Sequence, residues 1–169
     1  MIQKSRQSRE KKPRLEVPYP RIRVAAIILD GDSILLVRHV RDDRTYWLLP
    51  GGGVEYGESL EDALVRELKE EANLRIAVGE LVFVNDSVPG DKHRHVVNVY
   101  FTAKVRGGKL RCGRDARLVE LQYKPLADLP KLTFYPDIRK ELLRALRKGF
   151  PAKKTYLGNL WKDARIKTN

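Results

Sequence analysis

Three acidic side chains lie close together along the chain, at Glu67, Glu70 and Glu71. Spacings of three and four residues place them on one face of a helix, where like charges repel one another. A divalent cation would reverse that repulsion, because Mg²⁺ and Mn²⁺ prefer hard oxygen ligands such as carboxylates. The alternative is an ordinary solvated acidic face whose charge is offset by Arg66 and Lys69.

The segment before these glutamates could bring backbone groups close to the same ion. Gly51, Gly52 and Gly53 lack side chains, so their amides and carbonyls can approach an ion or a phosphate. A helix is expected to begin at Ser59, whose hydroxyl can cap its first turn, and to end near Asn73, which tolerates the left-handed conformation. The glutamates would then lie on a helix that follows a glycine-rich loop.

The order of these residues resembles the Nudix box, whose pattern is G-x5-E-x7-R-E-U-x-E-E-x-G-U with U an aliphatic residue. The match starts at Gly52, passes Glu58 and ends in the segment 66–74, RELKEEANL. Eight of the nine specified positions agree. Asn73 stands where the family has glycine, and asparagine also adopts the left-handed conformation that a helix end needs. The segment 47–53, WLLPGGG, is similar to the sequence that leads into the box in members of the family.

The resemblance to this MutT-like family implies a role for each matching residue. The metal ligands would be the carboxylates of Glu67, Glu70 and Glu71 and the backbone carbonyl of Gly52. The expected ion is Mg²⁺, with Mn²⁺ as a substitute. Arg66 would orient a box glutamate, and Glu58 would support Arg66 and the start of the helix. The family cleaves nucleoside diphosphates linked to another moiety, with water attacking a phosphorus of the pyrophosphate bridge.

More than one carboxylate could be the general base that removes a proton from the attacking water. Glu67 and Glu71 are the candidates within the box. Family members differ on this point, and some use a carboxylate in a distal loop. Asp115 is the best distal candidate here and Glu120 is second, although Asp115 is also a typical turn residue.

The remaining pattern predicts strands on both sides of this helix. The expected elements are a hairpin over 23–40, strands over 45–49, 81–85, 96–105 and 118–123, and a second amphipathic helix over 137–148. Several strands with only two main helices argue against a parallel series of β-α-β units. We therefore expect an α/β (α+β) fold, a Nudix-like α/β/α sandwich with a mixed β-sheet.

Charge divides the chain of 169 residues into three parts. The net charge is +12, yet residues 1–23 carry +6 and residues 139–169 carry +8, so the middle is slightly acidic. We expect a flexible basic arm over 1–20, a Nudix-like domain over 21–150, and a basic tail over 151–169 that is partly docked. The basic ends could attract nucleic acid such as RNA, or could simply keep the protein soluble.

Composition excludes several classes of protein. The single cysteine, Cys112, excludes an internal disulfide framework and a CxxC metal site, and it favours a reducing compartment, the cytoplasm. The longest apolar run, Val24–Leu29, is too short to cross a bilayer, so no membrane partner is expected. The first residues lack the apolar core of a secretory signal. A dimer is one option, because apolar residues in the tail could dock on a second subunit.

Several other side chains could take part in binding or catalysis, but we interpret them as structural. His93 and His95 could share one strand face but lack a third ligand at a matching spacing. His39 could face phosphate and is interpreted as structural. Four aromatic side chains could stack a purine but are expected in the core: Trp47, Phe83, Tyr100 and Phe101.

Two functions of different classes follow. The first is a Mg²⁺-dependent pyrophosphohydrolase acting on a nucleotide-derived small molecule, namely ADP-ribose, a nucleotide sugar or a (d)NTP-type substrate. Pro89, 15 residues after Leu74, resembles a feature of the family's ADP-ribose pyrophosphatases. The second is an RNA-directed Nudix protein, either a 5′-end pyrophosphohydrolase or a non-catalytic RNA-binding module. The intact set of box glutamates favours the enzyme.

Overall fold

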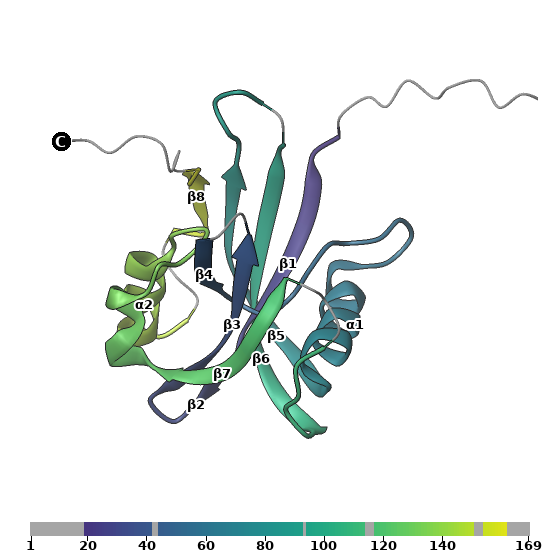
Figure 1. Ribbon diagram of the computed structural model, residues 1–169, viewed down its shortest axis with the longest axis vertical. Coiled ribbons are helices and arrows are strands. Elements are labelled where there is room, and N and C mark those ends of the chain that lie inside the picture. Colours follow the sequence, from purple (N-terminus) through teal and green to yellow (C-terminus); the bar gives the residue numbers. More distant parts are fainter. Residues whose placement is uncertain (1–18, 42–43, 93, 114–116, 151–153, 162–169) are drawn as a thin grey trace, which may run out of the picture.

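The computed structural model describes residues 19–41, 44–92, 94–113, 117–150 and 154–161 (Figure 1). Within them the chain forms two four-stranded sheets, two α-helices and one 3-10 helix. The described residues contain no helix that is both long enough and apolar enough to cross a membrane. Four features of the sequence lie wholly or largely outside these ranges: the expected N-terminal arm, the expected basic tail except for residues 154–161, the distal candidate Asp115, and His93.

The first sheet is mixed and has the strand order β1-β6-β5-β8. Its strands are β1 (Arg21–Ile27), β6 (Val96–Gly108), β5 (Leu74–Ser87) and β8 (Tyr156–Asn159). β1 runs parallel to β6, β6 is antiparallel to β5, and β5 is parallel to β8. The last pairing places part of the basic C-terminal segment at the edge of this sheet.

The second sheet is antiparallel and is built around β3 (Ser33–Arg41), which pairs with β2 (Leu29–Asp30), β4 (Arg44–Leu48) and β7 (Leu118–Pro125). The expected hairpin over 23–40 is confirmed at the turn of residues 31–32, where β2 pairs with β3, but its first strand does not extend back to residue 23, because β1 belongs to the other sheet. Val24, Ala25 and Ala26 are fully buried in succession, as expected for a strand covered on both faces.

The two α-helices lie on opposite sides of the sheets (Figure 1), which confirms the expected sandwich. They are α1 (Leu60–Ala72) and α2 (Arg139–Lys148), and the 3-10 helix η1 (Leu126–Lys131) precedes α2. The predicted limits of α1 are confirmed. The Asp62 N–H donates to the Ser59 hydroxyl at 3.1 Å, and Asn73 ends the helix with a φ of 55°.

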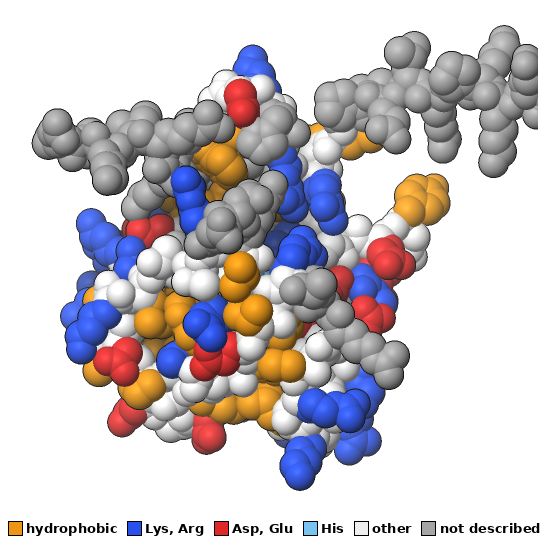
Figure 2. Space-filling model, in the orientation of Figure 1, with side chains coloured by type: hydrophobic (Ala, Val, Ile, Leu, Met, Phe, Trp, Pro, Cys, Tyr) orange, Lys and Arg blue, Asp and Glu red, His pale blue; other side chains and the backbone are white. Residues whose placement is uncertain are grey.

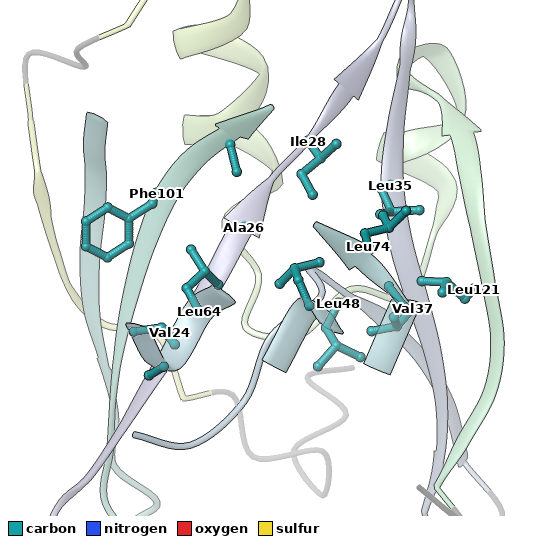
Figure 3. Close-up of a cluster of buried hydrophobic side chains, with 14 of the residues drawn as sticks. Val24, Ala26, Ile28, Leu35, Val37, Leu48, Leu64, Leu74, Phe101 and Leu121 are labelled. Carbon is teal, nitrogen blue, oxygen red and sulfur yellow. The ribbon is translucent and has the colours of Figure 1, made fainter. Parts of the chain in front are cut away.

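Two clusters of buried side chains anchor the chain before the glycine-rich loop. One lies beneath α1 and combines Leu64 and Leu68 with side chains of both sheets (Figure 3). The other lies beneath α2 and includes Leu142. Leu48 joins the first cluster and Leu49 joins the second. Because Leu48 is buried beneath α1 and Leu49 is buried beneath α2, both clusters fix the start of the glycine-rich loop that follows.

Basic side chains remain on the outer surface of α2. Lys140, Arg144, Arg147 and Lys148 are exposed. Figure 2 shows Lys and Arg side chains over this part of the surface. The basic C-terminal region therefore includes an ordered, charged helix face. Cys112 is also exposed, with a free thiol.

Candidate active site

The glycine-rich loop between β4 and α1 is bonded directly to β1. The Ala26 N–H donates to the Pro50 carbonyl and the Val24 N–H donates to the Gly52 carbonyl, both at 2.9 Å. Gly51 has a φ of 135°, and a Cβ at this position would overlap the Val24 carbonyl. Only glycine permits such a close approach of two backbone segments. The loop is therefore held against β1.

Arg23, which precedes the buried part of β1, ties the same loop with its side chain. Its Nη2 donates to the carbonyls of Leu49 at 2.8 Å and Gly51 at 3.0 Å. Its Nη1 is buried and has no hydrogen-bond partner among the described residues. Sequence reasoning missed Arg23. The available signal was a cation directly before the apolar run at Val24, because a cation that enters a buried region needs acceptors.

Glu71 contacts this loop through its carboxylate. Its Oε2 accepts a hydrogen bond from the Gly51 N–H at 2.7 Å, and its Oε1 lies 3.7 Å from Nε2 of His39 on β3. His39 is buried, and its Nε2 makes no hydrogen bond within the described part of the chain. The structure therefore places His39, which the sequence analysis interpreted as structural although it could also face phosphate, beside a box glutamate.

Arg66 connects four groups around the start of α1. Its strongest pairing is with Glu58, through Nη2–Oε1 at 2.7 Å and Nε–Oε2 at 3.1 Å. It also donates to Glu67 at 2.9 Å, to the Gly53 carbonyl at 2.9 Å and, more weakly, to Glu70 at 3.4 Å. Glu58 first and then Glu67 raise the pKa of Arg66, and the hydrogen bond from Arg66 lowers the pKa of Glu58. Arg66 is thus a fixed cation that orients its neighbours.

Glu67 and Glu70 differ in their surroundings. Glu67 is largely buried, and its desolvation raises the pKa of its carboxyl despite the opposing hydrogen bond from Arg66. A Cβ on Gly52 would overlap the Glu67 carboxylate, so the missing side chain creates the space that this carboxylate fills. Glu70 remains 63% exposed. One box glutamate is therefore enclosed by the loop while another faces solvent.

The donor set fits a divalent cation in its chemistry. Three carboxylates lie on consecutive turns of α1, and the missing side chain of Gly52 leaves the Glu67 carboxylate beside the loop, so hard oxygen donors of the kind that Mg²⁺ prefers gather there. The Gly52 carbonyl accepts one hydrogen bond and keeps a second lone pair. Within the described residues, no three His, Cys, Asp or Glu side chains already form a metal-binding group. Glu67 and Glu71 are instead bonded to Arg66 and to the Gly51 N–H.

The other candidate residues lie elsewhere. Asp115 is outside the described residues, and Glu120 is paired with Arg38 at 2.7 Å. His95 is bonded to Asp86 at 2.9 Å. Phe83, Tyr100 and Phe101 are buried, which confirms the core interpretation, whereas Trp47 is half-buried beneath the Lys124 ammonium, 4.5 Å from its ring centroid. None of these six described side chains is bonded to a box glutamate.

A family model for the NUDIX domain matches residues 19–146. The chain belongs to the NUDIX family. It is 39% identical over 128 residues to an ADP-ribose pyrophosphatase of Methanocaldococcus jannaschii, a match that covers 75% of each chain. It is 32% identical to a NAD-capped RNA hydrolase NudC of Pseudomonas fluorescens, covering 74% of this chain and 44% of the relative.

Solved structures agree with this assignment. A NUDIX hydrolase from Nitrosomonas europaea has a TM-score of 0.70 at 20% identity, covering 79% of this chain and 93% of the other, which supports the fold alone. An ADP-ribose pyrophosphatase from Streptococcus suis has a TM-score of 0.62 at 28% identity, covering 82% and 98%. The expected class is thereby confirmed: a NUDIX pyrophosphohydrolase, from a family that uses divalent metal ions and acts on nucleotide-derived small molecules.

Proposed function

We propose that this protein is a Mg²⁺-dependent pyrophosphohydrolase with ADP-ribose as its leading substrate. Nucleotide sugars and (d)NTP-type compounds are the alternatives in the same class. The observation that carries the proposal is the intact glutamate set of α1, in which Glu71 is hydrogen-bonded to the glycine-rich loop. The 39% identity to the ADP-ribose pyrophosphatase of Methanocaldococcus jannaschii supports the choice of substrate.

The residues around the start of α1 supply the functions that this reaction requires. Glu67, Glu70, Glu71 and the Gly52 carbonyl would hold Mg²⁺. When bound, the ion shields a diphosphate and lowers the pKa of water. Arg66 keeps the Glu67 carboxylate in one orientation, and Glu58 keeps Arg66 in place. The Gly51 N–H does the same for Glu71. The chain thus preorganises its carboxylates through the loop and one arginine.

Two box glutamates are candidates for the base that accepts the proton of the attacking water. Glu67 is one candidate, because its carboxylate fills the space beside Gly52 and is held in one orientation by Arg66. Glu71 is the other candidate, because its Oε1 lies beside the buried His39. Asp115 stays our distal candidate, outside the described residues.

Replacing the box glutamates tests this proposal. Glu67→Gln, Glu70→Gln and Glu71→Gln should each reduce turnover of ADP-ribose in Mg²⁺ by about 10²–10⁴-fold, in the range of lost acid–base or electrostatic catalysis. Glu61→Gln is the matched control, because Glu61 is an exposed carboxylate in the first turn of the same helix. Mn²⁺ should support turnover in the wild type. Unchanged activity in both Glu70→Gln and Glu71→Gln would overturn the assignment.

We also propose partners and a setting for the charged ends of the chain. The net charge of +12 supports attraction of RNA to the basic termini, either for an enzyme acting at RNA 5′ ends or for a binding module. A dimer is our proposal for the oligomeric state, to be checked by sedimentation. The single cysteine supports a cytoplasmic setting.

A further inference from the structure

Four aromatic rings form a continuous row that begins beside Glu71. The His39 ring centroid lies 6.0 Å from that of Tyr46, Tyr46 lies 6.0 Å from Tyr135, and Tyr135 lies 5.7 Å from Trp161. All three pairs are edge-to-face. The rings come from β3, β4, the segment before α2 and the segment after β8, so the row crosses both sheets.

Exposure separates this row from the aromatic core. Phe83 and Tyr100 are 1% exposed and Phe101 is 6% exposed, so none of them can receive a ligand. Beyond the buried His39, in contrast, Tyr46, Tyr135 and Trp161 are only half-buried. Their rings therefore combine fixed positions with accessible surface, and such side chains bind planar ligands at a low cost in conformational entropy.

The outer end of the row is positioned by β8. The Leu160 N–H donates to the Asp86 carbonyl at 2.8 Å, and the Trp161 N–H donates to the Asn159 side chain at 3.1 Å. That Asn159 side chain is bonded in turn to the backbone N–H of Val88 at 3.0 Å. The C-terminal strand thus brings Trp161 to the edge of the β3–β4 pair.

We propose that Tyr46, Tyr135 and Trp161 form the subsite for the nucleobase of the substrate. The inference rests on the proposed function, because it takes a diphosphate at Glu71 as its starting point. Each ring centroid lies 5.7–6.0 Å from the next, so the three half-buried rings are connected through His39 to the box glutamate Glu71. Stacking of a base on an aromatic ring strengthens binding by roughly 5- to 150-fold.

A purely structural row would stabilise the fold and would leave ligand binding unchanged. The two interpretations are separated by the affinities for AMP, which carries a base, and for ribose 5-phosphate, which lacks one. We expect Tyr46→Leu and Trp161→Leu to weaken AMP binding about tenfold and to leave ribose 5-phosphate unchanged. Tyr46→Phe, which keeps the ring, should bind AMP like the wild type. Tyr56→Leu is the control, because Tyr56 is fully exposed outside the row.

The two tryptophans provide a readout that does not depend on turnover. In a Trp47→Phe variant the remaining fluorescence comes from Trp161, and AMP should quench it in the absence of metal. In a Trp161→Phe variant, AMP should leave the fluorescence of Trp47 unchanged. Equal losses of AMP and ribose 5-phosphate affinity in the leucine variants, or no quenching of Trp161, would overturn the subsite. Hydrolysis of ADP-ribose by the wild type is measured separately, so the proposed function can stand when the subsite fails.

Discussion

Arg23 controls a catalytic candidate without touching it. Its Nη2 holds the carbonyls of Leu49 and Gly51, and the N–H of Gly51 holds Glu71. A small displacement of this loop would therefore move the Glu71 carboxylate. Because catalysis is sensitive to displacements of about 1 Å, the side chain of Arg23 should matter for turnover more than for folding.

Replacing Arg23 by methionine, which has a similar length, tests this connection. We expect Arg23→Met to lower kcat about ten- to a hundredfold, because the loop loses its tether. The KM should change little. Millimolar guanidinium should restore part of the activity by occupying the vacated position. The measurement is steady-state hydrolysis of ADP-ribose with and without added guanidinium.

Arg21→Met is the matched control, because Arg21 is an exposed arginine on the same strand. We expect near wild-type kcat for this variant. An equal loss in both variants, or a loss in Arg23→Met that follows its unfolding temperature, would show that Arg23 acts only through stability.

At the scale of single elements, the end of α1 depends on the left-handed conformation of Asn73. Its φ is 55°, its Nδ2 donates to the Lys109 carbonyl at 2.9 Å, and its Oδ1 accepts from Lys69 at 3.0 Å. Asparagine adopts this conformation more readily than other residues with a Cβ. The Asn73 side chain also bonds the helix end to the segment after β6, a contact that the glycine of the family pattern could not make.

Asn73→Ala should lower the free energy of unfolding by about 1–2 kcal/mol, because alanine in a left-handed conformation is strained and makes neither bond. Asn73→Gly should change it by less than about 1 kcal/mol, since relief of strain offsets the two lost hydrogen bonds. Urea unfolding of the three proteins measures both values. An alanine variant as stable as the glycine variant would contradict this account.

The attachment of β8 should depend on pH through Asp86. His95 bonds one carboxylate oxygen of Asp86 and the Tyr156 O–H donates to the other at 2.6 Å, and both contacts lower the pKa of Asp86. The folded state therefore binds a proton at Asp86 less readily than the unfolded state. The resulting stability is present above the ordinary pKa of 3.8 and is lost as the pH falls further.

Asp86→Asn should therefore have a lower urea midpoint than the wild type at pH 6, and the difference should shrink at pH 3. Asp128→Asn is the control, because Asp128 has only an exposed pairing with Lys131 at 3.4 Å. A difference between Asp86→Asn and the wild type that is the same at both pH values would exclude ionisation of Asp86 as its cause.

Across the whole molecule, local signals were readable from the sequence and long-range partners were not. The spacing from Gly52 to Leu74 predicted α1, its caps and the position of its glutamates, because each of these features depends on residues only a few positions apart in the sequence. The separation of β1 and β3 into different sheets was not predicted, because an apolar run indicates a buried strand but not the strand with which it pairs. His39 and Trp161 belong to one row only after both sheets have formed.

The whole-molecule charge predicts how RNA binding responds to salt. Residues 1–20 contain six Lys and Arg residues. Deleting them should weaken RNA binding and should reduce the slope of log K against log salt by at most about 4 if all six contact phosphates. Filter binding over a salt series measures the slope, with ADP-ribose turnover as the control that should not change. An unaltered slope would remove the N-terminal segment from any role in recruiting RNA.

The late position of β8 in the chain affects how the protein emerges from the ribosome. Asn159, which bonds the backbone of Val88, is translated 71 residues after it. At about 5–20 residues per second, β5 waits roughly 4–14 s for the strand that covers its outer edge. A bare strand edge is a template for pairing with other chains. Nascent chains on one polysome are therefore at risk of cross-pairing during this interval, and ribosome-associated chaperones should bind them at this stage.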